Sequence, residues 1–396
     1  MKRRDAMRWG VAGAAAVVAA CGGGGGVTVA GEGTLRMALT DAPSCGYDNV
    51  WVTVDRVRVH QDGGASESGS GWKEIVLPSP RRIDLLELTN GVLEELGQTK
   101  LPAGTYNQVR LVLAENTPAD PMANAVKPTG SAEVPLRTPS AQQSGLKLNT
   151  RFEVGANQTA DLVLDFDACR SVVVAGGSGN YNLKPVLSVA ERLNTGIQGY
   201  VSTTLSLSGT QVSAQQNGTV VRSTVPDTTG KFVLPFLPAG NYDIVITSTN
   251  RATAVVTSVP VTSAGTTAVN PSASPILPPA AGTVRTASGT AYVGAGTTEP
   301  ATDAEVSASQ SLTGGPTVLI ARMPVDATAG TWSMSLPASA PVKATYATGM
   351  GLTFSADAAA AGKYRLAASA PGLTTVTANT DLTSANQVVD FHFAAP

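Results

Sequence analysis

Charged residues are scarce in this chain of 396 residues, of which Asp, Glu, Lys and Arg make up only 14%. The formal net charge is −2, so the chain has no basic excess with which to neutralise phosphates. Proteins that bind nucleic acid generally carry such an excess. The composition therefore predicts no nucleic-acid partner.

Histidine is rarer still, with only His60 and His392 in the whole chain. A serine hydrolase needs a histidine base beside its nucleophile, and neither histidine lies in such a setting. No nucleophile-elbow motif is present either. We therefore expect a protein without enzymatic activity. A glycosidase needs only two carboxylates at a suitable separation, so a carboxylate-dependent hydrolase stays open as an alternative.

The chain has three cysteines, and they lack the neighbouring Cys or His residues that metal sites require. We expect no cofactor. Cys21 follows a basic start at residues 1–4 and an apolar stretch at residues 9–20. That stretch is shorter than the roughly 20 residues that span a bilayer, and it ends in small residues. Both features are typical of an export signal.

The run Val18-Ala19-Ala20-Cys21 resembles the lipobox of bacterial lipoproteins. The resemblance implies that residues 1–20 are a signal peptide, that Cys21 is lipidated, and that the glycine-rich residues 21–32 form a tether. Gly22 after the cysteine implies, by similarity to enterobacterial sorting, the outer membrane, with the domains facing the periplasm or the cell surface. An ordinary signal peptide that happens to end at a cysteine is the alternative.

The two other cysteines, Cys45 and Cys169, would then lie in an oxidising compartment, where leftover cysteines usually pair. We expect a Cys45–Cys169 disulfide. It would close a loop of more than a hundred residues, which stabilises the fold by on the order of 4 kcal/mol in the chain-entropy model.

The rest of the chain, with 41 glycines and turn signals at short intervals, is typical of an all-β protein. We predict three β-sandwich domains in series, at residues 33–193, 194–270 and 283–396. Residues 271–282 are rich in proline and are predicted to form a semi-rigid linker. Disorder is the alternative for the last region, which buries few large side chains.

Hydrophobic periodicity gives local expectations for the first domain. Leu35, Met37 and Leu39 alternate with polar residues, which indicates a half-buried edge or outer strand. In the next strand the hydrophobic phase slips between Val54 and Val57, which predicts a bulge near residues 55–56. Residues 92–96 are expected to form a short helix at most.

Two sets of residues are candidate sites in this domain. Asp161, Asp165 and Asp167 lie on one face of a strand and form a candidate calcium site, although a solvated polar face is the simpler interpretation. Trp51 and Trp72 are candidates for an aromatic surface that binds a glycan, although ordinary packing is the favoured interpretation of each. His60 is expected on the solvated face of its strand. The glycine-rich residues 176–179 lack the Lys-Ser/Thr of a phosphate loop and are predicted to form a hairpin turn.

Several short motifs of this domain follow one another in a familiar order, namely those at residues 39–43, 52–54, 101–106, 164–167 and 183–186. Together they resemble a family of bacterial lipoprotein domains known only as domain of unknown function 4382. The resemblance implies a periplasmic or surface β-domain and supplies no chemistry. The segment Ser44-Cys45-Gly46 departs from the usual pattern.

Residues 227–234 and 237–246 each combine a turn with a strand, and they closely resemble the carboxypeptidase-regulatory-like, transthyretin-type β-sandwich. That module implies no catalytic residues. The run Leu-Pro-Ala-Gly-x-Tyr occurs here at Leu237 and in the first domain at Leu101. Residues 326–336 repeat the turn-strand pattern with one extra residue, and a last strand is expected over residues 388–393.

The favoured function is that of a membrane-anchored cell-envelope lipoprotein that binds a glycan or an envelope protein. A purely structural spacer or assembly element is the second hypothesis, and the hydrolase is the third.

Overall fold

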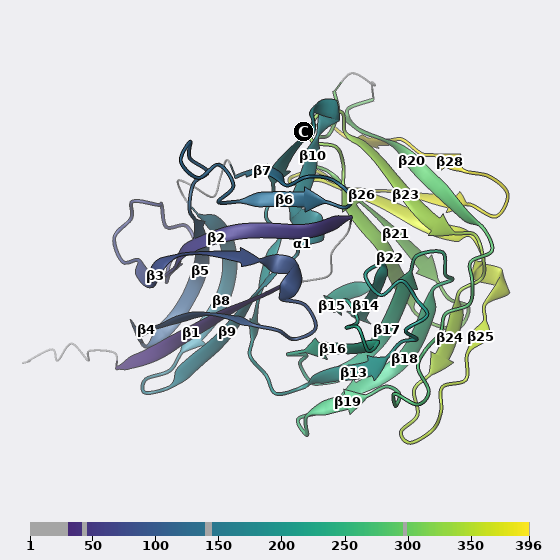
Figure 1. Cartoon of the computed structure of the whole chain (residues 1–396), viewed down its shortest axis with the longest axis horizontal. Coiled ribbons are helices and arrows are strands. Elements are labelled where there is room, and N and C mark those ends of the chain that lie inside the picture. Colours follow the sequence, from purple (N-terminus) through teal and green to yellow (C-terminus); the bar gives the residue numbers. More distant parts are fainter. Residues whose placement is uncertain (1–30, 42–45, 139–144, 296–298, 396) are drawn as a thin grey trace, which may run out of the picture.

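The computed structural model describes residues 31–41, 46–138, 145–295 and 299–395. Over these residues the regular secondary structure is almost entirely β-strand, which confirms the predicted fold class (Figure 1). The exceptions are α1 (Ala168–Ser171) and the 3₁₀ turns η1 (Leu85–Glu87), η2 (Gly176–Ser178) and η3 (Ala358–Ala360). No helix among these residues is long and apolar enough to cross a membrane.

The first part of the chain forms two sheets around one hydrophobic core. One sheet has the order β12-β9-β1-β4, with β1 (Glu32–Asp41), β4 (Glu94–Pro102), β9 (Thr159–Phe166) and β12 (Leu187–Glu191). The other has the order β10-β11-β7-β6-β2-β5-β8, with β3 paired to β2. Its strands are β2 (Tyr47–His60), β3 (Lys73–Asp84), β5 (Gly104–Leu113), β6 (Ala125–Pro128), β7 (Val134–Arg137), β8 (Leu146–Val154), β10 (Val172–Ala175) and β11 (Asn180–Leu183).

Of the expectations for β1, β2 and residues 92–96, one is confirmed and two are wrong. The pairing of β2 shifts register between Val54 and Arg56, so the predicted bulge is present and both Val54 and Val57 are buried. Strand β1 is not an edge strand, because it pairs in parallel with β9 and antiparallel with β4. The short helix expected at residues 92–96 is also wrong, since β4 begins at Glu94 and pairs with Leu39.

The second part contains the sheet β16-β13-β19 and most of the sheet β15-β14-β17-β18-β24-β25. Its strands are β13 (Gly196–Tyr200), β14 (Thr210–Gln216), β15 (Thr219–Thr224), β16 (Lys231–Pro235), β17 (Gly240–Ser248), β18 (Ala254–Val261) and β19 (Thr266–Ala268). The expected core face of β17 is confirmed, because Tyr242, Ile244 and Ile246 are buried. The two Leu-Pro-Ala-Gly-x-Tyr turns share one geometry. The hydroxyl of Tyr106 donates to the Pro102 carbonyl at 3.0 Å, and that of Tyr242 donates to the Pro238 carbonyl at 2.8 Å.

The third part is ordered β-structure with its own core. Its sheets have the orders β23-β20-β28, with β29 also paired to β20, and β22-β21-β26-β27. Its strands are β20 (Val284–Val293), β21 (Glu305–Ser311), β22 (Thr317–Pro324), β23 (Thr331–Pro337), β24 (Val342–Thr345), β25 (Ser355–Ala356), β26 (Lys363–Ser369), β27 (Val376–Asp381), β28 (Gln387–Val388) and β29 (Phe391–Phe393). The single strand expected over residues 388–393 is thus split in two.

The three parts pack against one another, as Figure 1 shows. Strand β24 of the third part pairs in parallel with β18 of the second, so one sheet crosses between them. Residues 271–282, predicted to form a semi-rigid linker, lie against the second part. Ile276 is buried against the second part and exchanges backbone hydrogen bonds with Tyr200 and Ser202, because its apolar side chain finds a place in that core.

Candidate functional site

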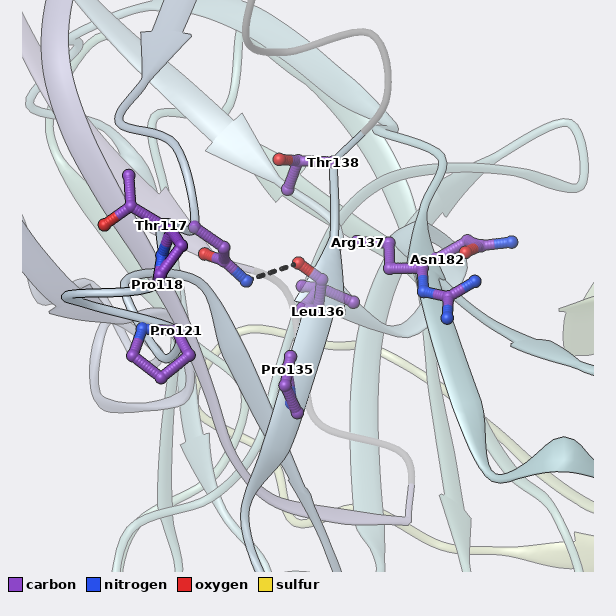
Figure 2. A pocket seen from close by; sticks show the side chains of 9 residues that line it. Thr117, Pro118, Pro121, Pro135, Leu136, Arg137, Thr138 and Asn182 are labelled. Carbon is purple, nitrogen blue, oxygen red and sulfur yellow. Dashed lines mark hydrogen bonds between the residues drawn. The ribbon is translucent and has the colours of Figure 1, made fainter.

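A pocket of about 700 Å³ opens on the first part of the chain, where the β5–β6 loop faces β7 and β11 (Figure 2). This volume falls within the range of small-molecule sites in proteins. Nine residues line the pocket: Asn116, Thr117, Pro118, Pro121, Pro135, Leu136, Arg137, Thr138 and Asn182.

The loop that forms one wall is fixed by two asparagines. Asn124, which is fully buried, accepts from the backbone N–H of Thr53 at 3.0 Å and donates to the carbonyl of Ala114 at 2.7 Å. Asn116 accepts from the Asn124 N–H at 2.7 Å, and its Nδ2 donates to the Asn124 and Leu136 carbonyls. Since both ends of the loop and β7 are tied to this pair, the wall is held in shape before any ligand arrives.

On the opposite side of the pocket, the alternation of side chains along β7 determines which residues line it. In β7 the side chain of Leu136 is buried in the core, whereas Pro135 and Arg137 on either side of it are exposed. Figure 2 shows Pro118 and Pro121 across the pocket from Arg137 and Asn182, with Pro135 between them. The pocket thus joins the apolar rings of three prolines to a polar corner.

That polar corner comes from two paired strands. Arg137 of β7 lies directly opposite Asn182 of β11 in a parallel register. Nη2 of Arg137 donates to Oδ1 of Asn180 at 3.1 Å, and Arg137 makes no ion pair with any described residue. The Asn182 side chain is half-buried and has no hydrogen bond within the described chain. The corner therefore offers unused N–H groups to the pocket.

The two tryptophans singled out in the sequence lie elsewhere, on the outer face of the larger sheet. The guanidinium carbons of Arg58 and Arg110 lie 4.6 and 4.8 Å from the ring centroid of Trp72, and the indole N–H donates to the Ser66 carbonyl. His60 also packs on this ring, and its Nδ1 accepts from the Asp62 N–H. These contacts fix the loop that follows β2. His60 therefore has a structural role that was not predicted from the sequence.

Trp51 is covered in the same way, because the Arg82 guanidinium carbon lies 4.3 Å from its ring centroid. A binding platform needs a bare ring face, whereas arginines stack on both of these tryptophans. The geometry favours packing over glycan binding for Trp51 and Trp72.

Each of the three aspartates proposed for calcium faces an arginine. Asp161 pairs with Arg36, and Asp165 pairs with Arg222 of the second part. Asp167 caps α1 by accepting from the Arg170 N–H at 3.1 Å. The described residues contain no group of three or more His, Cys, Asp or Glu side chains that could hold a metal ion. This arrangement does not support the calcium site.

Burial raises the pKa of Asp167 to about 6, although the nearby Arg170 opposes the shift. The carboxylate faces Arg170 and, beyond it, Glu305 of the third part. It lies at the contact between the two parts rather than in the pocket.

Of the three cysteines, the structure describes only Cys169. Cys169 lies in α1, but Cys21 and Cys45 fall outside the described residues, so the lipid anchor and the Cys45–Cys169 disulfide stay predictions. His392 contacts the carbonyl of Gly294 and stacks on Tyr292. The hairpin predicted at residues 176–179 is confirmed, since η2 joins the antiparallel strands β10 and β11.

None of the pocket residues was singled out from the sequence. The signal available was the run Glu-Asn-Thr-Pro-Ala-Asp-Pro-Met-Ala-Asn at residues 115–124, in which asparagines flank two prolines. Such a run predicts an irregular loop. It does not reveal that β7 and β11 complete a pocket against that loop.

Residues 32–185 match the sequence model of a family described as domain of unknown function DUF4382, in agreement with the resemblance of the first part. This match covers less than half of the chain. No curated protein matches this chain. The resemblance of the second part to carboxypeptidase-regulatory-like domains stays a prediction.

Several solved structures show detectable similarity to this chain. An interface mutant of a type II cohesin–X–dockerin complex from Acetivibrio cellulolyticus is 31% identical over 21% of this chain, with a TM-score of 0.18, and the chain spans about half, 55%, of that structure's length. The Bacillus anthracis TIE protein is 12% identical, covering 91% of this chain and 50% of its own, with a TM-score of 0.19. The major pilin SpaD from Corynebacterium diphtheriae is 10% identical, covering 92% and 98%, also with a TM-score of 0.19. Scores this low carry no argument about function.

Proposed function

We propose that the chain is a lipid-anchored protein of the bacterial cell envelope that binds a glycan in the pocket between the β5–β6 loop, β7 and β11, and that it catalyses no reaction. The observation that carries the proposal is the preorganised wall of this pocket. A buried Asn124 and its partner Asn116 fix the loop through backbone hydrogen bonds. A site that is rigid before binding loses less conformational entropy when the ligand arrives.

The chemistry of the lining favours a glycan over a folded protein partner. A protein interface needs a broad surface of about 800 Å² per partner with buried aromatic anchors, and the pocket is lined by no aromatic residue. Proline rings beside amide, hydroxyl and guanidinium groups match a sugar, which has apolar C–H faces and polar hydroxyls. The ligand is thus proposed to be a segment of a polysaccharide.

The same lining supports a role without catalysis. A hydrolase of the kind left open by the sequence needs two carboxylates, one of them as general acid. The residues lining the pocket include no aspartate, glutamate or histidine. Among the acids considered for chemistry, Asp161 and Asp165 each pair with an arginine.

The lipid anchor belongs to this proposal and has its own test. Cys21 is proposed to carry the lipid, with residues 22–32 as the tether that lets the body of the protein reach its ligand. Mass spectrometry of the mature protein from a bacterial membrane should find Cys21 as the modified first residue. A mature chain that starts elsewhere with an unmodified Cys21 would contradict the anchor without touching the pocket.

The pocket is tested by blocking it. Pro135→Trp fills the pocket from an exposed position of β7, so it should abolish retention of the protein in gels that contain the polysaccharide it binds. Val76→Trp is the matched control, because Val76 is 60% exposed and lies on β3 outside the pocket. Retention that survives Pro135→Trp would place binding elsewhere. If wild-type protein is retained by no polysaccharide of a broad panel, the structural-spacer hypothesis is favoured instead.

A further inference from the structure

The electrostatics of the pocket narrow the class of glycan, in an inference that rests on the function proposed above. Arg137 is the only charged residue among the nine that line the pocket. Its single hydrogen bond goes to the neutral side chain of Asn180, and within the described chain no carboxylate pairs with it. Arg82, by contrast, pairs with Glu133. The pocket therefore holds one uncompensated positive charge.

The geometry of this charge suits a planar anion. An arginine guanidinium presents its N–H groups as a fork that matches the two oxygens of a carboxylate. One side of the Arg137 fork is taken by Asn180, which orients the group and leaves the remaining N–H groups available. Asn182, directly opposite in the register, adds an amide that has no partner in the described chain. Two strands thus converge on the position where a carboxylate would be held.

The backbone around the pocket argues against the carboxyl terminus of a peptide as the ligand. Peptide carboxylates are commonly captured by clusters of backbone N–H groups. Here Pro118, Pro121 and Pro135 have no N–H, the N–H groups of Thr117 and Asp120 bond within their own loop, and that of Leu136 donates to Asn124. Recognition is left to the side chains of Arg137 and Asn182. The proline rings fit the C–H face of a sugar that carries the carboxylate.

We infer that the pocket binds a uronic-acid residue of an acidic polysaccharide, with its carboxylate held by Arg137 and Asn182 and its ring against the prolines. The carboxylate takes hydrogen bonds from the guanidinium and from the Asn182 amide. Because the ion pair between Arg137 and the carboxylate is accessible to solvent, binding weakens as the salt concentration rises.

The test uses the full chain and three probes: oligogalacturonate, the same oligosaccharide after its carboxyl groups are reduced to alcohols, and a sulfated galactan. Isothermal titration calorimetry at low salt should show binding of oligogalacturonate. Carboxyl reduction should weaken it at least tenfold, which is the scale of one charge-assisted hydrogen bond. The sulfated polymer separates a carboxylate site from a general anion site, and equal or tighter binding of it would overturn the uronate assignment.

Variants then assign the effect to the pocket. Arg137→Gln should weaken oligogalacturonate binding at least tenfold and remove the difference between that probe and its reduced form. Arg151→Gln is the matched control, since Arg151 is an exposed arginine of β8 outside the pocket. Asn182→Ala should weaken binding several-fold while the thermal midpoint stays near that of the wild type.

The outcomes distinguish the two proposals. If the reduced and the acidic probes bind equally and Arg137→Gln changes neither, the uronate assignment is wrong while the pocket still stands as a glycan site. If Pro135→Trp abolishes binding but Arg137→Gln does not, the conclusion is the same. If none of the three probes binds, the uronate assignment fails, and the glycan function is then decided by the broad polysaccharide panel described above.

Discussion

The ion pair between Arg222 of the second part and Asp165 of the first gives the sharpest test of how the parts are held together. Both side chains are largely buried, at 7% and 16% exposure. Arg222 lies on β15 and Asp165 on β9, so the pair joins two sheets that belong to separate hydrophobic cores. Asn90 lies close by and reinforces the contact by accepting from the Val233 N–H at 2.5 Å.

Removal of one partner leaves the other as a buried charge without compensation. Arg222→Leu strands the Asp165 carboxylate, and Asp165→Leu strands the guanidinium. Either change should destabilise the protein by about 3–5 kcal/mol. Nε of Arg222 is buried without a hydrogen-bond partner among the described residues, so the pair is not fully satisfied even in the native protein. Replacement of both residues by leucine should therefore cost little, within about 1 kcal/mol.

Urea is the suitable denaturant, because guanidinium is itself a salt and screens ion pairs. Unfolding is followed by tryptophan fluorescence, in which Trp51 and Trp72 report on the first part and Trp332 on the third. Arg151→Leu is the matched control. Its pair with Glu153 is 71% exposed on both sides, so its loss should cost less than about 1 kcal/mol.

Two results would refute this reasoning. A loss for Arg222→Leu as small as that for Arg151→Leu would mean that the pair is effectively solvated. A double variant that costs the sum of the two single changes would mean that the residues do not interact. A urea transition that splits in two only in the single variants would instead support the role of the pair in joining the parts.

Three further predictions concern single groups. Burial raises the pKa of Asp167 from 3.8 to about 6, so the folded state binds more protons than the unfolded state between these pH values. The contribution of this group to stability is therefore complete below about pH 4 and is lost as the pH rises through about 6. Asp167→Asn keeps a capping oxygen and should reduce the pH dependence of the thermal midpoint over that range in calorimetry. An unchanged pH dependence would contradict the raised pKa of Asp167. Tyr242→Phe removes the hydrogen bond to the Pro238 carbonyl and should lower the free energy of urea unfolding by about 1 kcal/mol. Tyr106→Phe should have the same effect at the first turn, and an unchanged free energy of unfolding for both variants would show these hydrogen bonds to be unimportant. Reduction of a Cys45–Cys169 disulfide should lower stability by about 4 kcal/mol, and a free-thiol assay that finds both cysteines reactive in the oxidised mature protein would disprove the pairing.

The features predicted correctly from the sequence are those that depend on neighbouring residues. The phase slip between Val54 and Val57 required a bulge if both were to be buried, and the pairing of β2 shifts there. The turn that begins at Asp326 repeats the one at Asp227, since in each case the aspartate carboxylate accepts from backbone N–H groups of the turn. Local hydrogen bonds of this kind follow from the residue types alone.

The failures come from pairings between residues far apart in the chain. Alternation along β1 shows which side chains are buried but not how many strands flank it, and the parallel partner β9 lies more than a hundred residues away. Residues 92–96 have weak helical preferences, but Leu96 is buried and Glu94 pairs with β1, so tertiary packing overrides propensity.

The pocket escaped prediction for the same reason. Asn116 and Asn124 read as ordinary loop residues, because what makes them structural is their contacts with Thr53 and Leu136. The register that sets Arg137 opposite Asn182 joins two four-residue strands, each too short to leave a periodic pattern.

The position of the pocket also changes how the later parts of the chain should be regarded. Asn182 lies on the β10–β11 hairpin, and the third part holds that hairpin, since the Gly176 N–H donates to Asp326 at 2.9 Å and the Ala327 N–H donates to the Val174 carbonyl. Arg170, just before β10, pairs with Glu305 of the third part. The third part therefore holds the hairpin that contributes Asn182 to the pocket. A structural role of the third part is therefore compatible with the binding proposed for the first part, because the third part holds the hairpin that lines the pocket.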